Sequence, residues 1–322
     1  MKILANDGID PVGKNILEQA GFVVDTEHIK ADDLFNRLNE YDAITVRSAT
    51  QLPMELIDAA PNIKLIGRGG VGMDNIDVAY ARAKGIKVVN TPAASSLSVA
   101  ELVFSHLFSG VRFLHDAQRK MPAEGANSFA KLKKAYSKGV ELRGKTLGII
   151  GFGRIGQEVA RIGLGLGMHV IVSDLLEVPE TISVSFASGH TVDLPVQKKE
   201  LIEVFMEADF ISFHVPFTEA PVLGRSEFAF LKQGVGLVNT SRGGVIDEEA
   251  LLEALDSGAV SFAGLDVFQD EPTPSQAILA HPKISLSPHI GAATGEAQER
   301  VGVELANLIV AHFSVLKQHV ND

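Results

Sequence analysis

A glycine motif between two apolar runs constrains the fold of this chain more than any other stretch. Gly151, Gly153 and Gly156 give the spacing G-x-G-x-x-G, directly after a short apolar run typical of a buried parallel strand. Apolar residues then recur at helical spacing over 157–167, and a second apolar run follows at 169–172. This order of strand, glycines, helix and strand predicts a βαβ unit.

Each part of the motif has a physical reason to bind a dinucleotide. Gly151 permits the tight strand-to-helix turn, Gly153 lets the backbone approach a pyrophosphate, and Gly156 lets the helix pack on the strand. The helix N-terminus offers unpaired N–H groups to the phosphates. Asp174 follows Gly156 by 18 residues, close to the ~20 expected of the carboxylate that binds a ribose 2′-OH. Because a carboxylate repels a 2′-phosphate, the sequence predicts NAD rather than NADP.

Composition narrows the range of folds and partners. The 322 residues are 46% hydrophobic, which suits two ordinary α/β domains. A formal net charge of −11 argues against a nucleic-acid partner and against anionic membrane surfaces, so an anionic substrate would need a local cluster of Arg and Lys. No apolar run approaches the length of a membrane span, and cysteine is absent. We expect a cytoplasmic protein without disulfides or thiolate metal sites.

The first ninety residues repeat a strand–helix rhythm. Strands are expected at 3–5, 22–24, 43–46, 65–66 and 88–89, and helices at 12–20, 31–38, 54–60 and 78–84. After the glycine motif, strands are expected at 210–213, 236–239 and 264–267, and helices at 199–206, 226–231, 248–257 and 296–315. An apolar helix at 99–113 stands between the two series. The predicted fold class is α/β, with two Rossmann-like or flavodoxin-like parallel-sheet domains.

Two segments of the first series invite a functional interpretation. Arg47 stands where a parallel strand would end, and the glycine-rich run 67–72 follows the next strand. Ligands of open α/β sheets bind outside the carboxyl ends of the strands, and glycine-rich loops can hold anions. A solvated surface arginine and a plain turn explain the same residues equally well, so both interpretations stay open.

Two further segments lack a catalytic pattern. Residues 119–139 show little periodicity and a cluster of lysines between 131 and 138, so we expect a solvated loop, with an arm across a dimer interface as the alternative. Residues 181–196 alternate polar and apolar around a Ser-Gly turn, which predicts a hairpin inserted at the surface, with His190 exposed.

Charged and polar groups stand at the ends of three later strands. Arg242, Glu271 and His289 would converge on one edge of the sheet, the edge that holds the nicotinamide end of a dinucleotide. Hydride transfer to a carbonyl needs a proton donor, and His suits this best. A carboxylate on its other nitrogen would fix its tautomer, and an Arg fork would hold a carboxylate. On composition alone, His281 and His214 compete with His289.

Seven ordered segments resemble the D-2-hydroxyacid dehydrogenase family, and the resemblance runs from about Met1 to the last helical pattern. They are Val46–Thr50, Gly69–Asp77, Gly151–Gly156, His214–Pro216, Ser241–Asp247, Gly264–Phe268 with Glu271-Pro272, and Pro288–Ala292. Within the family the resemblance is closest to the D-3-phosphoglycerate dehydrogenases, which catalyse the first step of L-serine biosynthesis. It implies an NAD-dependent oxidoreductase for a small anionic 2-hydroxy or 2-keto acid.

The resemblance also implies roles for individual residues. Arg242 would bind the carboxylate and keto group of the substrate, Glu271 would support the catalytic histidine, and His289 would be the acid–base. Cofactor contacts are implied for Val71, Gly151, Gly153, Arg154, Ile155, Gly156, Asp174, His214, Val215, Pro216, Thr240, Ser241, Arg242, Asp266, His289, Gly291 and Ala292. Substrate contacts are implied for Arg47, Ser48, Gly69, Gly70, Arg242, His289 and Lys134. No metal is expected.

The family organisation implies a cofactor domain over 96–289 inserted into a substrate domain made of 1–95 and 290–322, with the active site in the cleft. Two copies would form a homodimer through the cofactor domain. Lys134 falls near an Arg of relatives, so a contact with substrate phosphate from a partner subunit is expected of it. Longer relatives add regulatory domains where this chain ends, and we expect the short form.

Two alternative functions remain. The glyoxylate/hydroxypyruvate reductases share the family motifs, although Arg47 together with the lysine cluster favours a phosphorylated substrate. An NADH-sensing corepressor can keep the same fold and catalytic residues. The acidic balance of the chain counts against the corepressor.

Overall fold

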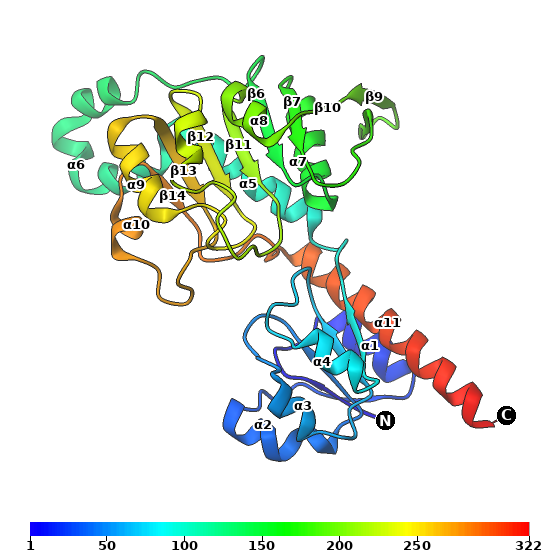
Figure 1. The fold of residues 1–322 in the computed structure, drawn as a ribbon. Coiled ribbons are helices and arrows are strands. Elements are labelled where there is room, and N and C mark those ends of the chain that lie inside the picture. The colour runs from blue at the N-terminus through cyan, green and yellow to red at the C-terminus, as the bar shows by residue number, and fades with distance from the viewer. Residues whose placement is uncertain (322) are drawn as a thin grey trace. The chain divides into compact units, whose positions relative to one another are not determined.

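Two parallel sheets, one of five strands and one of seven, form the framework of the chain in a computed structural model that describes residues 1–321. The surroundings of side chains are described up to residue 315. One compact unit comprises Met1–Ser96 with Ala292–Asp322, and the other comprises Leu97–Gly291. Each sheet belongs to one unit (Figure 1).

The first unit has the strand order β2-β1-β3-β4-β5, which is the flavodoxin-like order. Its strands are β1 (Lys2–Ala5), β2 (Val23–Asp25), β3 (Ala43–Val46), β4 (Leu65–Arg68) and β5 (Lys87–Asn90). Its helices are α1 (Pro11–Gln19), α2 (Ala31–Arg37), α3 (Met54–Asp58), α4 (Val78–Ala83) and α11 (Gly295–Asn321), with a 3-10 turn η1 (Leu38–Glu40) after α2.

Alternating side chains of these strands build two cores, one on each face of the sheet. Ile3 and Leu65 pack against α1 and α11, whereas Leu4 and Ile66 pack against α2, α3 and α4. Successive strand residues point to opposite faces, so each buried strand must be apolar on both sides. The continuous apolar runs in the sequence follow from this three-layer arrangement.

The second unit has the strand order β10-β7-β6-β11-β12-β13-β14, with every pairing parallel. Its strands are β6 (Thr146–Ile150), β7 (His169–Ser173), β10 (Gln197–Lys198), β11 (Phe210–Phe213), β12 (Val235–Asn239), β13 (Val260–Leu265) and β14 (Ile284–Leu286). Strand order reverses between β6 and β11, which is the point where open α/β sheets bind their ligands.

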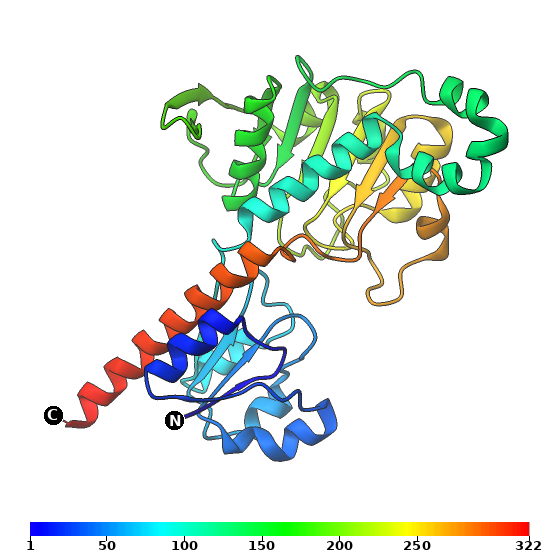
Figure 2. The same ribbon diagram turned by 180° about the vertical axis from the view of Figure 1, so that it is seen from behind.

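Helices cover both faces of this larger sheet. α5 (Ser96–Val111) and α7 (Arg154–Gly165) share one apolar core with it, and α8 (Leu201–Glu207) and α9 (Glu248–Ser257) share the other. Figure 2 shows α5 running across the strands on its face. The short helix α10 (Gln276–Ala280) and the 3-10 turn η2 (Glu227–Phe230) lie in the connections.

The structure confirms the α/β class and the strand–helix rhythm, and it corrects two segments. The helix expected at 226–231 is only the 3-10 turn η2. The expected loop at 119–139 is largely the helix α6 (Leu114–Ala135), which contains Pro122 and has non-helical angles at Ser128. Its sequence is rich in Ala and Lys, which favour helix, but most of its residues are exposed. A helix without a strong apolar stripe gives little periodic signal, so the prediction of a loop was wrong.

The expected hairpin is confirmed. β8 (Thr181–Ser185) pairs antiparallel with β9 (Thr191–Pro195), and His190 is exposed beside the turn. Within the part of the chain that the structure describes, no single helix is long and apolar enough to cross a membrane. α5 and α6 satisfy that test only as a pair bent by 57°.

Candidate active site

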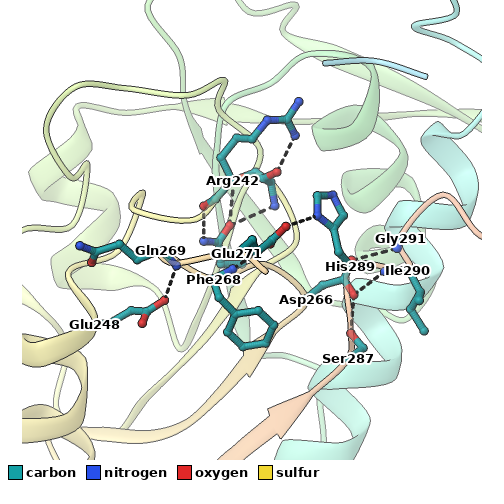
Figure 3. Close-up of polar contacts among 12 residues, drawn as sticks. Arg242, Glu248, Asp266, Phe268, Gln269, Glu271, Ser287, His289, Ile290 and Gly291 are labelled. Carbon is teal, nitrogen blue, oxygen red and sulfur yellow. Dashed lines mark hydrogen bonds and ion pairs between the residues drawn. The ribbon is translucent and has the colours of Figure 1, made fainter. Parts of the chain in front are cut away.

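Three parallel strands of the second unit bring the predicted catalytic residues to one edge of the sheet. Arg242 follows β12, Glu271 follows β13 and His289 follows β14, each beyond the carboxyl end of its strand. Figure 3 shows Glu271 and His289 pointing toward one another, with Arg242 extending above them. This convergence is the one expected from parallel strands.

A hydrogen bond joins the histidine and the glutamate. Nδ1 of His289 lies 2.8 Å from Oε2 of Glu271, while Oε1 of Glu271 accepts a bond of 3.0 Å from the backbone N–H of Phe268. The His289 side chain is 47% exposed, so its ring can exchange protons with a small molecule. Because Glu271 occupies Nδ1, Nε2 is the nitrogen left for proton transfer.

The turn that carries His289 is held by Asp266. His289 has φ 53°, a left-handed conformation that is uncommon outside glycine. Its backbone N–H donates to the carbonyl of Asp266 at 2.8 Å. The Asp266 carboxylate, which is 1% exposed, accepts bonds of 2.8 Å from the backbone N–H groups of both Ile290 and Gly291. Asp266 therefore fixes the direction in which the histidine leaves the sheet.

The Arg242 loop is shaped by the buried Asn239 at the end of β12. The Asn239 amide donates to the carbonyl of Arg242 at 2.8 Å, and its oxygen accepts from the Ser241 backbone at 3.0 Å. A Cβ on Gly243 would collide with the carbonyl oxygen of Phe268. The glycine therefore lets the arginine loop pack against the loop that leads to Glu271.

The structure separates the three histidines that the sequence left in competition. His214 bonds Ser212 at 2.8 Å, and burial lowers the pKa of His214 to about 3, so its ring stays neutral near neutral pH. His281 precedes β14, at the amino end of that strand, and its Nε2 lies 3.3 Å from Asp256. His289 is the one placed at the carboxyl edge with a carboxylate on its ring.

The glycine motif has the geometry that a dinucleotide needs. Gly151 has φ 91°, and a Cβ there would lie 2.6 Å from the carbonyl oxygen of His214. A Cβ on Gly156 would collide with the carbonyl oxygen of Gly151. By contrast, a Cβ on Gly153, which caps α7, would meet nothing within 4 Å, so space is open at the helix N-terminus. The residues fit a bound pyrophosphate.

Asp174 lies just beyond β7 and is tied to the motif. Its carboxylate accepts the backbone N–H of Phe152 at 2.5 Å and that of Leu176 at 2.8 Å. The acid that is expected at the ribose therefore also orders the glycine loop.

The other predicted cofactor residues of this unit follow strands β6, β11, β12 and β14 at the same edge. They are Arg154, Ile155, His214, Val215, Pro216, Thr240, Ser241 and Gly291. Within the described part of the chain, Oγ1 of Thr240 and Nδ1 of His214 are buried without a hydrogen-bond partner. Buried polar atoms rarely stay unsatisfied, which fits a site that a bound ligand or water completes.

The predicted substrate residues of the first unit lie at the carboxyl ends of its own strands. Arg47 follows β3 and Gly69 follows β4, and both line a cavity of about 280 Å³ together with Asp7, which follows β1. Gly70 has φ 143°, which disfavours any other residue. The other predicted residues of this unit are Ser48, Val71 and Ala292. Lys134 is exposed near the carboxyl end of α6, so its contact with a partner's substrate stays a prediction.

Asp7 is a residue that the sequence analysis missed. Oδ2 of its carboxylate accepts the backbone N–H groups of Arg47 at 2.7 Å and of Thr50 at 3.1 Å, and Oδ1 accepts the Thr50 hydroxyl at 2.5 Å. Asn75 donates to the carbonyls of the same two residues at 3.0 and 2.6 Å. The sequence signal was present, since Asp7 is a polar residue at a strand end, but its partners are some forty positions away.

Comparisons with known proteins agree with this geometry. Residues 104–291 match the family model described as D-isomer specific 2-hydroxyacid dehydrogenase, NAD binding domain. A hydroxypyruvate reductase of Thermotoga maritima is 43% identical over 320 residues, covering 98% of this chain and 99% of that relative. A D-3-phosphoglycerate dehydrogenase of Sus scrofa is 40% identical over 95% of this chain, but the chain spans 55% of that relative's length.

A comparison with solved structures also finds 2-hydroxyacid dehydrogenases. A D-lactate dehydrogenase from Aquifex aeolicus, complexed with NAD and lactic acid, superimposes with a TM-score of 0.78 at 28% identity, covering 100% of this chain and 98% of the other. The family model covers more than half of the chain, and NAD is the cofactor of the matched domain. The chain therefore belongs to the D-isomer-specific 2-hydroxyacid dehydrogenase family, with NAD as its cofactor.

Proposed function

We propose that the protein catalyses the NAD-dependent oxidation of D-3-phosphoglycerate to 3-phosphohydroxypyruvate, the first step of L-serine biosynthesis. The observation that carries the chemistry is the hydrogen-bonded pair of His289 and Glu271 at the carboxyl edge of the NAD-binding unit, where Arg242 follows the neighbouring strand β12. The substrate assignment rests on Arg47 and on the relatives that are D-3-phosphoglycerate dehydrogenases.

Each residue of this group has a distinct task. Nε2 of His289 accepts the proton of the substrate hydroxyl during oxidation and returns it during reduction. Glu271 holds Nδ1–H and stabilises the imidazolium that results. Arg242 binds the α-carboxylate through its guanidinium. Bound NAD would supply the acceptor for the hydride that leaves the hydroxyl-bearing carbon.

Residues of both units enter the proposal for the substrate. Arg47 would bind the phosphate. Gly69 and Gly70, whose backbone N–H groups donate to the carbonyls of Val46 and Arg68 at 2.8 and 3.0 Å, would let the carboxylate approach the main chain closely. Lys134 would contact the phosphate from a partner subunit, in a cytoplasmic homodimer joined through the cofactor unit. The absence of cysteine supports that location.

A reductase of hydroxypyruvate is the second candidate. It is favoured by the relative from Thermotoga maritima, which matches this chain over 99% of its own length. Hydroxypyruvate differs from 3-phosphohydroxypyruvate by the phosphate, so the two functions share every role except that of the cation at the far end of the substrate.

Initial rates with a panel of substrates test the proposal. D-3-Phosphoglycerate, D-glycerate and D-lactate are compared with NAD, and the two oxo acids 3-phosphohydroxypyruvate and hydroxypyruvate are compared with NADH. We expect the highest kcat/KM for the phosphorylated pair. A higher kcat/KM for hydroxypyruvate would transfer the assignment to the second candidate, and no turnover of any 2-hydroxy or 2-oxo acid would contradict both.

A further inference from the structure

A buried histidine of α5 is hydrogen-bonded to one serine in β14 and to another just after it, on the way to His289. His106 is 4% exposed, its Nδ1 lies 2.9 Å from Oγ of Ser285, and its Nε2 lies 2.9 Å from Oγ of Ser287. The His106 side chain packs directly on the main chain of Gly264 in β13. A Cβ at Gly264 would lie only 2.5 Å from Cβ of His106, so no larger residue fits there. The fit is therefore specific to this side chain.

The proton positions in this cluster follow from what each group can do. Oγ of Ser287 lies 2.6 Å from Oδ1 of Asp266, and a carboxylate can only accept, so Ser287 donates its hydrogen to Asp266. The oxygen of Ser287 must then accept from Nε2–H of His106. A neutral ring has its other nitrogen, Nδ1, free to accept from Ser285. The Ser285 hydroxyl lies 2.9 Å from Nδ1 and 3.4 Å from Oγ of Ser109, so the shorter contact to the ring takes its hydrogen. The geometry specifies the Nε2–H tautomer.

The ring is neutral for a physical reason. Burial lowers the pKa of His106 to about 4; the charge of Asp266 acts in the opposite direction and His115 acts in the same direction. At neutral pH His106 is thus a directional donor toward Ser287 and not a cation.

The chain of bonds ends at the catalytic turn. Asp266 receives Ser287 on Oδ1 and holds the backbone of Ile290 and Gly291 with the same carboxylate (Figure 3). A serine hydroxyl rotates freely, and without a donor on its oxygen it can turn its hydrogen away from Asp266. The Nε2–H of His106 donates to the Ser287 oxygen and so keeps the Ser287 hydrogen directed at Asp266.

We propose that His106 is a positioning residue for the reaction: its Nε2–H directs the Ser287 hydroxyl onto Asp266, which fixes the turn that presents His289. The inference deepens the proposed function and its effect on turnover rests on that function. His106 touches neither the substrate nor the cofactor in this account and acts only through Ser287 and Asp266.

Two substitutions at one position separate positioning from packing. His106→Leu removes the donor, whereas His106→Gln keeps an N–H at a similar distance from the main chain and stays neutral. We expect His106→Leu to lower kcat about tenfold, the loss typical of a hydrogen bond to a charged network, with little change in KM for the oxo acid. His106→Gln should recover most of that loss. Equal losses in the two variants would mean that the ring is only a packing element.

A matched control exists in the same unit. The ring nitrogens of His115 lie 3.3 and 3.0 Å from the backbone carbonyl oxygens of Ser109 and Pro282, and among the described residues no hydrogen bond joins His115 to Asp266 or Ser287. His115→Leu should keep the wild-type kcat. A further test is the double variant with Ser287→Ala, in which His106→Leu should cause no additional loss. Additive losses would contradict action through Ser287.

The tautomer of His106 can be measured by NMR independently of enzyme turnover. Long-range proton–nitrogen NMR correlations distinguish the two neutral tautomers from the imidazolium, and the His106→Gln spectrum identifies the signal of His106. We expect a neutral Nε2–H ring at neutral pH. A neutral Nδ1–H ring or an imidazolium would overturn the inference. A wild-type protein without turnover would contradict the proposed function instead, and the tautomer would still decide whether the directed bond exists.

Discussion

His289 and Glu271 show how a functional pair is made from residues that are ordinary by themselves. Both side chains are partly exposed, and neither is held by burial. Their direction comes from the backbone, through the bond from Phe268 to Glu271 and the three bonds that Asp266 makes to the histidine turn. The reaction therefore depends on Phe268 and Asp266, which position the two side chains, as well as on His289 and Glu271.

Asp174 is expected to control the choice of cofactor. Asp174→Ala removes an acceptor for the ribose hydroxyl, a source of repulsion toward a 2′-phosphate, and the bond to Phe152 in the glycine loop. The dissociation constant of NADH should rise, and discrimination against NADPH should fall. Titration of both cofactors against the variant checks this, with Asp193→Ala in the hairpin as the control. Unchanged discrimination would contradict the assignment.

Arg47 is expected to set the preference for phosphate. A charge-assisted contact is worth about 1.5–3 kcal/mol, so Arg47→Ala should lower kcat/KM for D-3-phosphoglycerate by about ten- to a hundredfold. The same variant should leave kcat/KM for D-glycerate almost unchanged. D-Glycerate offers Arg242, Glu271 and His289 the same carboxylate and hydroxyl as D-3-phosphoglycerate. Equal losses on the two substrates would make Arg47 structural and favour the hydroxypyruvate reductases.

His106 should make stability depend on pH. Its pKa is about 4 in the folded protein and near 6.5 in the unfolded chain, so only the unfolded state binds a proton between these values. Stability from the neutral ring is present above pH 6.5 and is lost as pH falls toward 4. The difference in free energy of unfolding between wild type and His106→Gln should fall by at most ~1.4 kcal/mol per pH unit in this window. Denaturant titrations at several pH values measure this difference in the free energy of unfolding. A difference that grows as the pH falls would contradict the lowered pKa of His106.

At the scale of elements, the start of α7 is placed by the close packing of Gly156 on the main chain of Gly151. Gly156→Ala forces a Cβ onto the carbonyl of Gly151 and should destabilise the unit by about 1–3 kcal/mol and weaken NADH binding. Gly165 lies in the same helix, where a Cβ meets nothing within 4 Å. Gly165→Ala should be neutral or stabilise by up to ~1 kcal/mol. Thermal unfolding of both variants is the measurement, and similar shifts would contradict the packing argument.

Elements that bury an apolar face could be predicted from the sequence, and so could the hairpin with its alternating pattern and Ser-Gly turn. Two other elements could not. The run at 210–213 is buried at every position, and the structure confirms the predicted strand. α6 is mostly exposed and was missed, and β14 has only three residues, whose strand character comes from pairing with β13. Such elements are defined by neighbours that are distant in the sequence.

At the scale of the molecule, the two strand orders explain why the candidate site was predictable. In both units the polar strand ends lie at the carboxyl edge of a parallel sheet, so position along the chain indicates which edge a residue occupies. The contacts of the supporting groups were not predictable, because Asp7, Asn239 and His106 bond partners that only the fold brings near them.

The most direct test of the central claim is the turnover of His289→Ala, measured as kcat at saturating NADH and oxo acid, beside His281→Ala. General acid–base catalysis typically contributes ~10²–10⁴-fold, so kcat of His289→Ala should fall by that factor while the dissociation constant of NADH stays close to the wild-type value. His281→Ala should remain near wild type. Retained turnover in His289→Ala, or its loss in His281→Ala, would contradict the account.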